Sequence, residues 1–446
     1  MQILKLFKVS VAASMLFSVC DRSVAENPDL SQRVRNLPSG NAAAPLPSEC
    51  SAPGVIAIPY DLPVYWDRPD SPTFTYRFQI QPATEPHPSG TAPLGIVLPG
   101  GAGAPSIGMA PGRVFPRTFH VIYTDVRGAG CNVGDPGIPF PADALTTEYF
   151  SRDVLAVVQY LRLATYVVFG ISYGTVHATV MTNIAQREGI QAPSALVLEG
   201  ILGNWWINEQ EVVDYNKEWN AAKTLLPPSV VSAFQTASPY GVSSSDWMLL
   251  LTKTLNEGTT PERRGNSTVF FLRPLDTTDP DDLAQAIATI QDEIARIKAG
   301  FRADTLRLAN ILHCTETTGS VYKKDLVNGE IVNTGPDQCP GWGLRHIHPY
   351  DSANYPVTVP IYYFEGSQDP NTSPANAYHH FVNQTQTHRL FTLVLAGGHT
   401  DMSGTLHQMG CTPAIFEAIA MNGTGLEAAL EQCRWPMWFE IRRPGE

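Results

Sequence analysis

The chain is poor in charged residues, and no basic run stands out in it. Only 16% of its 446 residues are charged, and Asp and Glu outnumber Lys and Arg by 42 to 30, which gives a formal net charge of −12. Proteins that bind nucleic acid or anionic membranes usually carry a basic patch. The composition therefore argues against nucleic acid and stable membrane anchoring as partners, whereas the 43% hydrophobic content is typical of a globular protein.

Motifs for metal ions and nucleotide cofactors are also missing. The sequence contains no Cys-x-x-Cys and no His-Glu-x-x-His spacing, so it predicts no metal site. A glycine-rich run at residues 99–103 lacks the Gly-Lys-Ser/Thr of a phosphate loop and the spacing of a dinucleotide fingerprint. We expect no cofactor, and we expect a small molecule or a peptide as the substrate.

Residues 1–25 have the pattern of a signal peptide. Lys5 and Lys8 precede a short apolar run at residues 9–19, and Ser23 and Ala25 are the small residues that a cleavage site requires. The apolar run is too short to span a bilayer, and no later run reaches the roughly 20 residues that a spanning helix needs. We expect a secreted or periplasmic protein; lipidation at Cys20 is the alternative, but the bulky Val19 disfavours it.

Without Cys20, the chain has six cysteines, an even number that suits disulfides in an oxidising compartment. Pairing cannot be deduced from a sequence alone, because six cysteines allow many connectivities. The sequence-local guess joins Cys314 to Cys339 and Cys411 to Cys433, and leaves Cys50 for Cys131.

Continuous apolar runs alternate with amphipathic segments on both sides of a long polar stretch. This alternation is typical of buried parallel strands and the helices that cover them. The predicted strands are residues 55–60, 74–80, 94–98, 119–124, 166–169, 195–198, 357–364 and 390–395, and a helix is predicted at 147–161. We expect an α/β fold with a mostly parallel sheet, helices on both faces, and a sheet domain built from residues 50–200 and 351–446.

Residues 201–350 interrupt this alternation and predict an inserted, mainly helical cap. A helix is expected at residues 281–299, which begin with acidic residues and carry apolar residues at helical spacing. The insertion is rich in tryptophan, and these side chains could line a substrate pocket or form the core of the cap; the core is the commoner role. The tryptophans are Trp205, Trp206, Trp219, Trp247 and Trp342.

Gly170-Ile171-Ser172-Tyr173-Gly174 directly follows one of the apolar runs. A Gly-x-Ser-x-Gly segment between a strand and a helix is the signature of a nucleophile elbow, where glycines make room for a strained turn at the serine. The segment predicts that Ser172 is a nucleophile.

A serine nucleophile needs a base, and the base needs a carboxylate that orients it. His399 follows the last predicted strand through a Gly-Gly loop, and Asp369 follows the strand before it. The order Ser172, Asp369, His399 is that of α/β-hydrolases. His407 is the main rival for the base, and Glu365 and Glu199 are the alternatives for the acid.

The oxyanion of an acyl-transfer reaction needs two backbone N–H donors. We expect one from Tyr173, the residue after the nucleophile, and one from the glycine-rich loop, with Gly101 as the first choice.

At this point the chain resembles a known family, the α/β-hydrolase exopeptidases of the proline iminopeptidase and tripeptidyl aminopeptidase-like type. Residues 98–106 look like the family's His-Gly-Gly-Pro-Gly loop, although Pro99 and Ala102 replace its histidine and proline. Residues 125–130 are similar to its Asp-Gln-Arg-Gly segment, in which Asp125 and Arg127 are expected to hold loops together. The elbow and the C-terminal region, with Asp369, His399 and the last two cysteines, complete the likeness.

The resemblance implies the α/β-hydrolase fold and the triad Ser172, Asp369 and His399. It also implies acidic residues that bind the free amino terminus of the substrate, for which Glu199 and Glu209 are candidates. We therefore expect a secreted serine aminopeptidase that works through an acyl-enzyme. A carboxylesterase or lipase acting on small esters is the alternative, and an inactive hydrolase fold used for binding is a third possibility.

Overall fold

The computed structural model describes residues 48–58, 60–110, 112–133, 140–204, 208–236, 238–257, 259–260, 265–345, 349–385, 388–433 and 438–443. The predicted signal peptide and Cys20 lie outside these residues. Among the helices that the structure describes, none is long and apolar enough to cross a membrane.

A nine-stranded sheet forms the body of the molecule, in the order β1-β4-β6-β5-β7-β8-β13-β14-β15. The six strands from β6 to β14 run parallel, and β1, β4 and β15 are antiparallel to their neighbours. The strands are β1 (Val55–Ala57), β4 (Arg77–Gln81), β5 (Leu94–Leu98), β6 (His120–Thr124), β7 (Val167–Ile171), β8 (Ala195–Glu199), β13 (Ile361–Gly366), β14 (Arg389–Leu395) and β15 (Trp438–Arg442).

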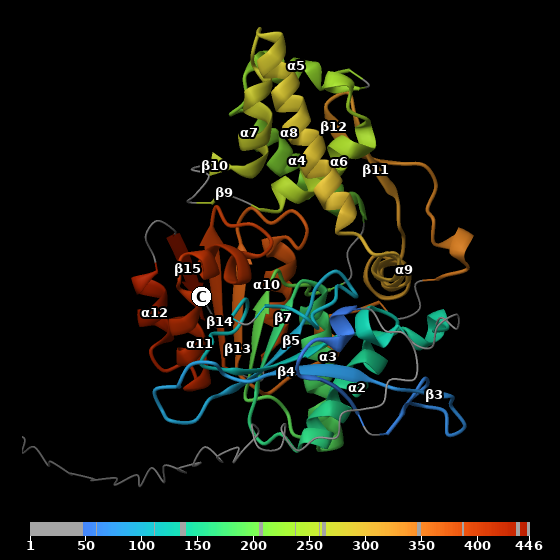
Figure 1. Ribbon diagram of the computed structural model, residues 1–446, viewed down its shortest axis with the longest axis vertical. Coiled ribbons are helices and arrows are strands. Elements are labelled where there is room, and N and C mark those ends of the chain that lie inside the picture. The colour runs from blue at the N-terminus through green and yellow to red at the C-terminus, as the bar shows by residue number, and fades with distance from the viewer. Residues whose placement is uncertain are drawn as a thin grey trace, which may run out of the picture.

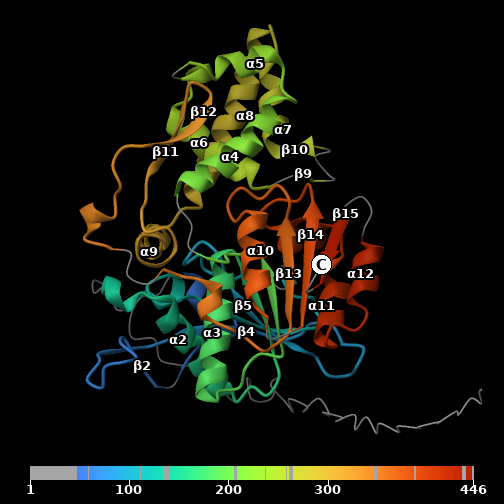
Figure 2. The ribbon, with the colours of Figure 1, turned by 180° about the vertical axis from the view of Figure 1, so that it is seen from behind.

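Helices cover both faces of this sheet, as Figure 1 and Figure 2 show from opposite sides. Successive side chains of a strand point to opposite faces, so Ile96 and Leu98 of β5 enter one core and Val97 enters the other. The first core takes in α2 (Thr147–Leu161), α3 (Tyr173–Glu188) and α10 (Pro374–Asn383), and the second takes in α11 (Thr412–Ala420) and α12 (Leu426–Gln432). The predicted fold class, a mostly parallel α/β-hydrolase sheet with an inserted helical cap, is confirmed.

The inserted segment has a hydrophobic core of its own, and it lies beyond the carboxyl ends of β13 and β14 (Figure 1). Trp219 and Trp247 are fully buried in that core, so for these two the core role is correct, whereas Trp342 is exposed and Trp205 and Trp206 lie outside the described residues. The cap helices are α4 (Asn208–Lys223), α5 (Pro228–Ala233), α6 (Ser244–Leu255), α7 (Ser267–Leu272) and α8 (Pro280–Ala299).

Two short antiparallel pairs complete the cap, β9 (Thr259–Thr260) with β10 (Gly265–Asn266), and β11 (Lys323–Val327) with β12 (Glu330–Thr334). Helix α9 (Ala303–Leu312) belongs to the insertion in sequence but packs with the sheet domain. Its Leu308, Ile311 and Leu312 pack into the first core of the sheet domain.

The structure corrects three details of the predicted strands. The strand expected at residues 357–364 begins only at Ile361 and ends at Gly366. The single strand expected at residues 74–80 is divided into β3 (Thr73–Phe74), which pairs with β2 (Leu62–Pro63), and β4, which pairs with β1 and β6. The chain changes sheet between them, and this change depends on partners that are distant in sequence. Strand β15 was not predicted.

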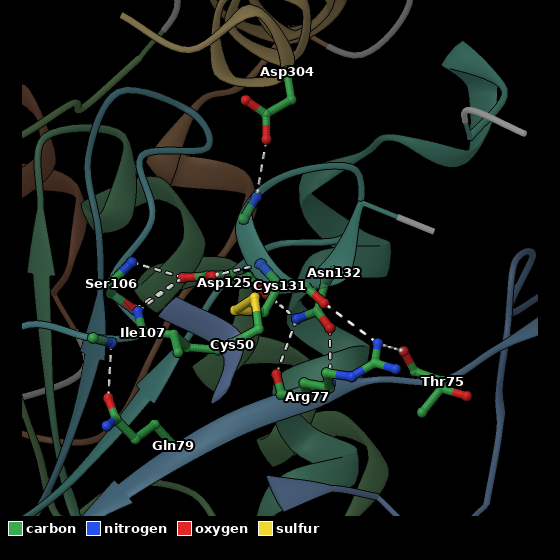
Figure 3. The surroundings of a disulfide bond; sticks show 12 residues. Cys50, Thr75, Arg77, Gln79, Ser106, Ile107, Asp125, Cys131, Asn132 and Asp304 are labelled. Atoms are coloured by element: carbon green, nitrogen blue, oxygen red, sulfur yellow. Dashed lines mark hydrogen bonds between the residues drawn. A yellow bond between two sulfur atoms is a disulfide. The ribbon is translucent and has the colours of Figure 1, made fainter. Parts of the chain in front are cut away.

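Three disulfides join Cys50 to Cys131, Cys314 to Cys339, and Cys411 to Cys433, which are the three guessed pairs. The first one links the chain just before β1 to the loop after β6 (Figure 3). In that loop the Asp125 carboxylate accepts hydrogen bonds from the backbone N–H groups of Ser106 (2.6 Å), Ile107 (3.1 Å) and Cys131 (2.9 Å). Asp125 therefore ties the segment that follows the glycine-rich loop to the loop after β6, and the disulfide ties that second loop to the chain before β1.

Removing this disulfide by the paired change C50S and C131S should lower the melting temperature. The bond closes a loop of sequence separation 81, and loss of a native disulfide typically costs about 2–5 kcal/mol. Differential scanning calorimetry under non-reducing conditions measures the change. The pair C411S and C433S, with a separation of 22, is the control and should show the smaller loss. Equal melting temperatures for the first variant and the wild type would contradict this expectation.

Candidate active site

Ser172 lies between the end of β7 and the start of α3 in a strained backbone conformation. Its φ of 52° and ψ of −121° are rare for a residue with a side chain, as a nucleophile elbow requires. The flanking glycines have a steric reason, because a Cβ at Gly170 would lie 2.5 Å from the Gly174 carbonyl oxygen, and one at Gly174 would collide with the Leu98 carbonyl oxygen. The Ser172 N–H donates a 2.8 Å hydrogen bond to the Glu199 carbonyl.

The structure brings Asp369 and His399 together. The distance from His399 Nδ1 to Asp369 Oδ2 is 2.8 Å. The other bonds to the Asp369 carboxylate come from the Thr372 hydroxyl (2.6 Å) and from the backbone N–H groups of Asn371 (2.8 Å) and Thr372 (3.0 Å). This set of donors holds the carboxylate in one orientation, and the carboxylate orients the imidazole.

Asp369 and His399 also stabilise each other's charged form. Burial by itself would raise the pKa of Asp369, but the charge and hydrogen bond of His399 and the hydrogen bonds from Thr372 together outweigh burial and lower this pKa. Burial would lower the pKa of His399, and the charge and hydrogen bond of Asp369 reverse this and raise it. Asp369 is therefore ionised near neutral pH, and it stabilises the protonated form of the imidazole.

The second imidazole nitrogen of His399 faces Asn371. Asn371 Nδ2 lies 3.2 Å from His399 Nε2, so this nitrogen accepts a hydrogen bond when Nδ1 carries the proton toward Asp369. Among the described contacts, this amide and not Ser172 Oγ is the partner of Nε2. Catalytic hydrogen bonds are often long or poorly aligned without substrate. His399 Nε2 would exchange Asn371 for Ser172 Oγ as its partner when substrate binds.

The His399 loop packs closely against Gly200, beside the elbow. A Cβ at this position would lie 2.9 Å from Cε1 and Nδ1 of the His399 ring, and 2.7 Å from the His399 carbonyl oxygen.

The preceding residue, Glu199, is fully buried, and its carboxylate accepts hydrogen bonds from the Ser403 N–H (2.9 Å) and hydroxyl (2.7 Å). Burial raises the pKa of Glu199 to about 7, although the bonds from Ser403 and the charge of His399 oppose the shift.

The other histidines have different surroundings. His407 contacts Thr412 at 3.2 Å, and His380 is buried between Thr179 and Tyr363. Burial lowers the pKa of His177 to about 4, and that of His380 to about 3. These two rings remain neutral in the interior of the domain, and no described contact joins any of the three to Asp369.

The predicted oxyanion donors belong to elements that lie beside the elbow. Tyr173 is the first residue of α3, and the glycine-rich loop passes over the elbow, since a Cβ at Gly100 would lie 2.9 Å from the Ser172 Cβ. Gly101 follows with a φ of 63°. The assignment of the N–H groups of Gly101 and Tyr173 stays a prediction.

Of the two acids considered for substrate binding, Glu199 lies under the His399 loop and Glu209 belongs to α4, where the structure does not describe its side chain. Sequence reasoning did not single out Asp214, also on α4. Burial raises the pKa of Asp214 and the charge of Asp369 adds a smaller rise, while hydrogen bonds from Gln210 and Ser373 and the charge of Lys217 oppose the shift. Asp214 is therefore a half-buried carboxylate of the cap whose charge interacts with that of Asp369. No helix period or motif distinguishes it from the other acids of α4.

No protein-family model and no curated protein matches the sequence. Among solved structures, the chain is similar to a proline iminopeptidase from Mycobacterium smegmatis, with 15% identity and a TM-score of 0.44 over 83% of this chain and 100% of that one. It is also similar to a proline iminopeptidase-related protein from Thermus thermophilus, with 16% identity and a TM-score of 0.37 over 84% and 98% of the two chains.

A third similar structure is an N-acyl homoserine lactone degrading enzyme, with 14% identity and a TM-score of 0.38 over 77% of this chain and 96% of that one. Similarity at this level says nothing about the reaction or the substrate. Among the described residues, no cluster of His, Cys, Asp and Glu is arranged to hold a metal ion.

Gly200→Ala should impair the candidate site without unfolding the domain, because the new methyl group would displace the His399 ring. Misplacing a catalytic group by about 1 Å can cost about 100-fold in rate, so we expect a loss of that order in labelling of Ser172 by a fluorophosphonate. Gly189→Ala is the matched control. Gly189 has a similar φ, 68° against 58°, but a Cβ there meets nothing within 4 Å. Equal losses in the two variants would mean that backbone strain, and not contact with His399, is responsible.

Proposed function

We propose that the protein is a secreted serine hydrolase, and specifically an aminopeptidase that releases N-terminal residues or short peptides through an acyl-enzyme. The observation that carries the hydrolase proposal is the strained Ser172 elbow beside a hydrogen-bonded Asp369–His399 pair, with a spacing of 2.8 Å between the two side chains. Three disulfides support an oxidising compartment.

In the proposed reaction, His399 Nε2 accepts the proton of Ser172 Oγ as the oxygen attacks the substrate carbonyl. The negative charge moves to the carbonyl oxygen, where the N–H groups of Gly101 and Tyr173 would stabilise it. His399 then gives its proton to the leaving amine, and the carbon–nitrogen bond breaks. A water molecule repeats the sequence on the acyl-enzyme and restores Ser172.

An acidic environment supports a substrate with a free amino group. Asp214 of the cap interacts electrostatically with Asp369, and Lys253, whose charge lowers the pKa of His399, is paired with Glu257 at 2.9 Å. A protonated amine gains from nearby carboxylates, whereas an acetylated amine has no charge. Since Glu199 is fully buried under the His399 loop, Asp214 is the better candidate for contact with the amine.

Ser172→Ala should abolish turnover and leave the fold intact, and His399→Ala should do nearly the same. Loss of a triad member typically lowers the rate by about 10⁴- to 10⁶-fold. Steady-state hydrolysis of aminoacyl-naphthylamides measures the loss, and circular dichroism checks the fold. His407→Ala is the control and should retain activity. If His407→Ala were inactive and His399→Ala active, the assignment of the base would be wrong.

The aminopeptidase proposal predicts a preference for free amino termini. Aminoacyl- and tripeptidyl-naphthylamides should be cleaved faster than their N-acetylated forms, and Asp214→Asn should raise the KM for the free forms only. Equal turnover of free and acetylated substrates would overturn the aminopeptidase assignment. Turnover of p-nitrophenyl esters without any amide hydrolysis would favour the esterase alternative.

The activity should rise with pH through the pKa of His399, because only the neutral imidazole can accept the proton of Ser172. Asp369 raises this pKa above its ordinary value of 6.5, so the midpoint of the acidic limb of kcat/KM should lie above pH 6.5. Asp369→Asn removes the charge and should move the limb to lower pH as well as reduce the rate. A limb that stays in place in Asp369→Asn would show that another group titrates.

A further inference from the structure

Glu365 is a buried carboxyl group that the proposed reaction does not use. It lies at the end of β13, next to Gly366, and its side chain is fully buried. Oε2 accepts a 2.9 Å hydrogen bond from the Ile201 N–H. Oε1 is buried and accepts no hydrogen bond from any residue that the structure describes. If Glu365 were ionised, its buried Oε1 would have lost its hydration without gaining a hydrogen bond in return.

The groups around Glu365 oppose a negative charge on it. The carboxylate of Asp369 interacts directly with it, and that of Asp401 adds further repulsion; the pKa of Glu365 is raised well above its usual range, first by burial and then by Asp369. From β8, Glu199 lies in register with Phe364, the neighbour of Glu365. His399 is the titratable base of the group, and it is bonded to Asp369.

Two buried carboxyl groups that interact in this way cannot both be ionised at low cost, so one of them holds a proton. Asp369 accepts four hydrogen bonds, from His399, Asn371 and twice from Thr372, which favour its charged form. Glu365 Oε1 accepts none from the part of the chain that the structure describes. The proton therefore belongs on Glu365.

We propose that Glu365 is a positioning residue: a neutral carboxylic acid that presents the proton on Oε1 to the Asp369 carboxylate. Its Oε2 is held by Ile201, so the group is fixed between the end of β8 and the Asp369 loop. The neutral acid donates a hydrogen bond to Asp369 and adds no negative charge beside it, so Asp369 stays the ionised member of the pair. The inference rests on the proposed function, because it assigns Glu365 a role through Asp369.

The test compares Glu365→Gln with Glu365→Met. The Gln amide can present an N–H to Asp369 and accept from Ile201, whereas Met has a similar length and can do neither. We expect Glu365→Gln to keep the fluorophosphonate labelling rate within about threefold of wild type, and Glu365→Met to lose about 10- to 100-fold. Glu218→Gln is the control, since Glu218 is a buried acid of the cap that pairs with Lys217. It should behave as wild type.

Two further readouts separate a neutral Glu365 from a charged one. The acidic limb of the pH profile should not move in Glu365→Gln, because a neutral group replaces a neutral group; loss of a charged carboxylate would shift it to lower pH. At about pH 8, buried acids with a pKa near 7 are mostly ionised. Infrared spectra of the wild type at this pH should still contain a protonated-carboxyl band. The band should disappear in Glu365→Gln and remain in Ser172→Ala.

The outcomes distinguish the two proposals. If Asp369→Asn labels as fast as wild type, the proposed function fails. If Asp369→Asn is slow but Glu365→Gln is as impaired as Glu365→Met, or if the acidic limb shifts in Glu365→Gln, the role of Glu365 as a neutral donor is overturned while the function stands. The absence of the infrared band in wild type would also overturn it.

Discussion

The carboxyl end of β8 is the element on which both halves of the candidate site depend. The backbone carbonyl of Glu199 accepts a hydrogen bond from the Ser172 N–H, and the Glu199 carboxylate accepts two from Ser403. Gly200 packs against the ring of His399. Two consecutive residues thereby connect the turn at Ser172 with the loop that carries His399. Because β8 lies between β7 and β13 inside the parallel sheet, it is buried and its position is determined by pairing on both sides.

Burial and hydrogen bonding sort the acids of the site into different states. Asp369 is surrounded by donors and has a lowered pKa, whereas burial raises the pKa of Glu199 to about 7 and that of Glu365 well above its usual range. The charge state of a buried acid follows the number of donors that face it, more than its residue type. Three buried acids of one site therefore have three different pKa shifts.

The cap is connected to the site as well as covering it. The N–H of His399 donates a 2.7 Å hydrogen bond to the carbonyl of Asn256 at the end of α6, and the Asn256 side chain accepts from Tyr215 of α4 at 3.1 Å. Helix α9 packs into the core of the sheet domain below, and Thr305 donates a hydrogen bond to the Gly103 carbonyl at 3.1 Å. Contacts from the insertion therefore reach both the histidine loop and the glycine-rich loop.

Local patterns in the chain were enough to predict most strands of the sheet, the elbow at Ser172, and the position of Asp369 and His399 after later strands. Apolar runs, glycine spacing and chain order carry this information, and all three can be read without knowing which segments meet. Local patterns could not predict strand β15, the division at residues 73–81, the hydrogen bond between Asp214 and Ser373, or the electrostatic interaction of Glu365 with Asp369. These features arise from folding, because each depends on groups from distant segments and on how much water and how many donors remain around a side chain in the folded domain.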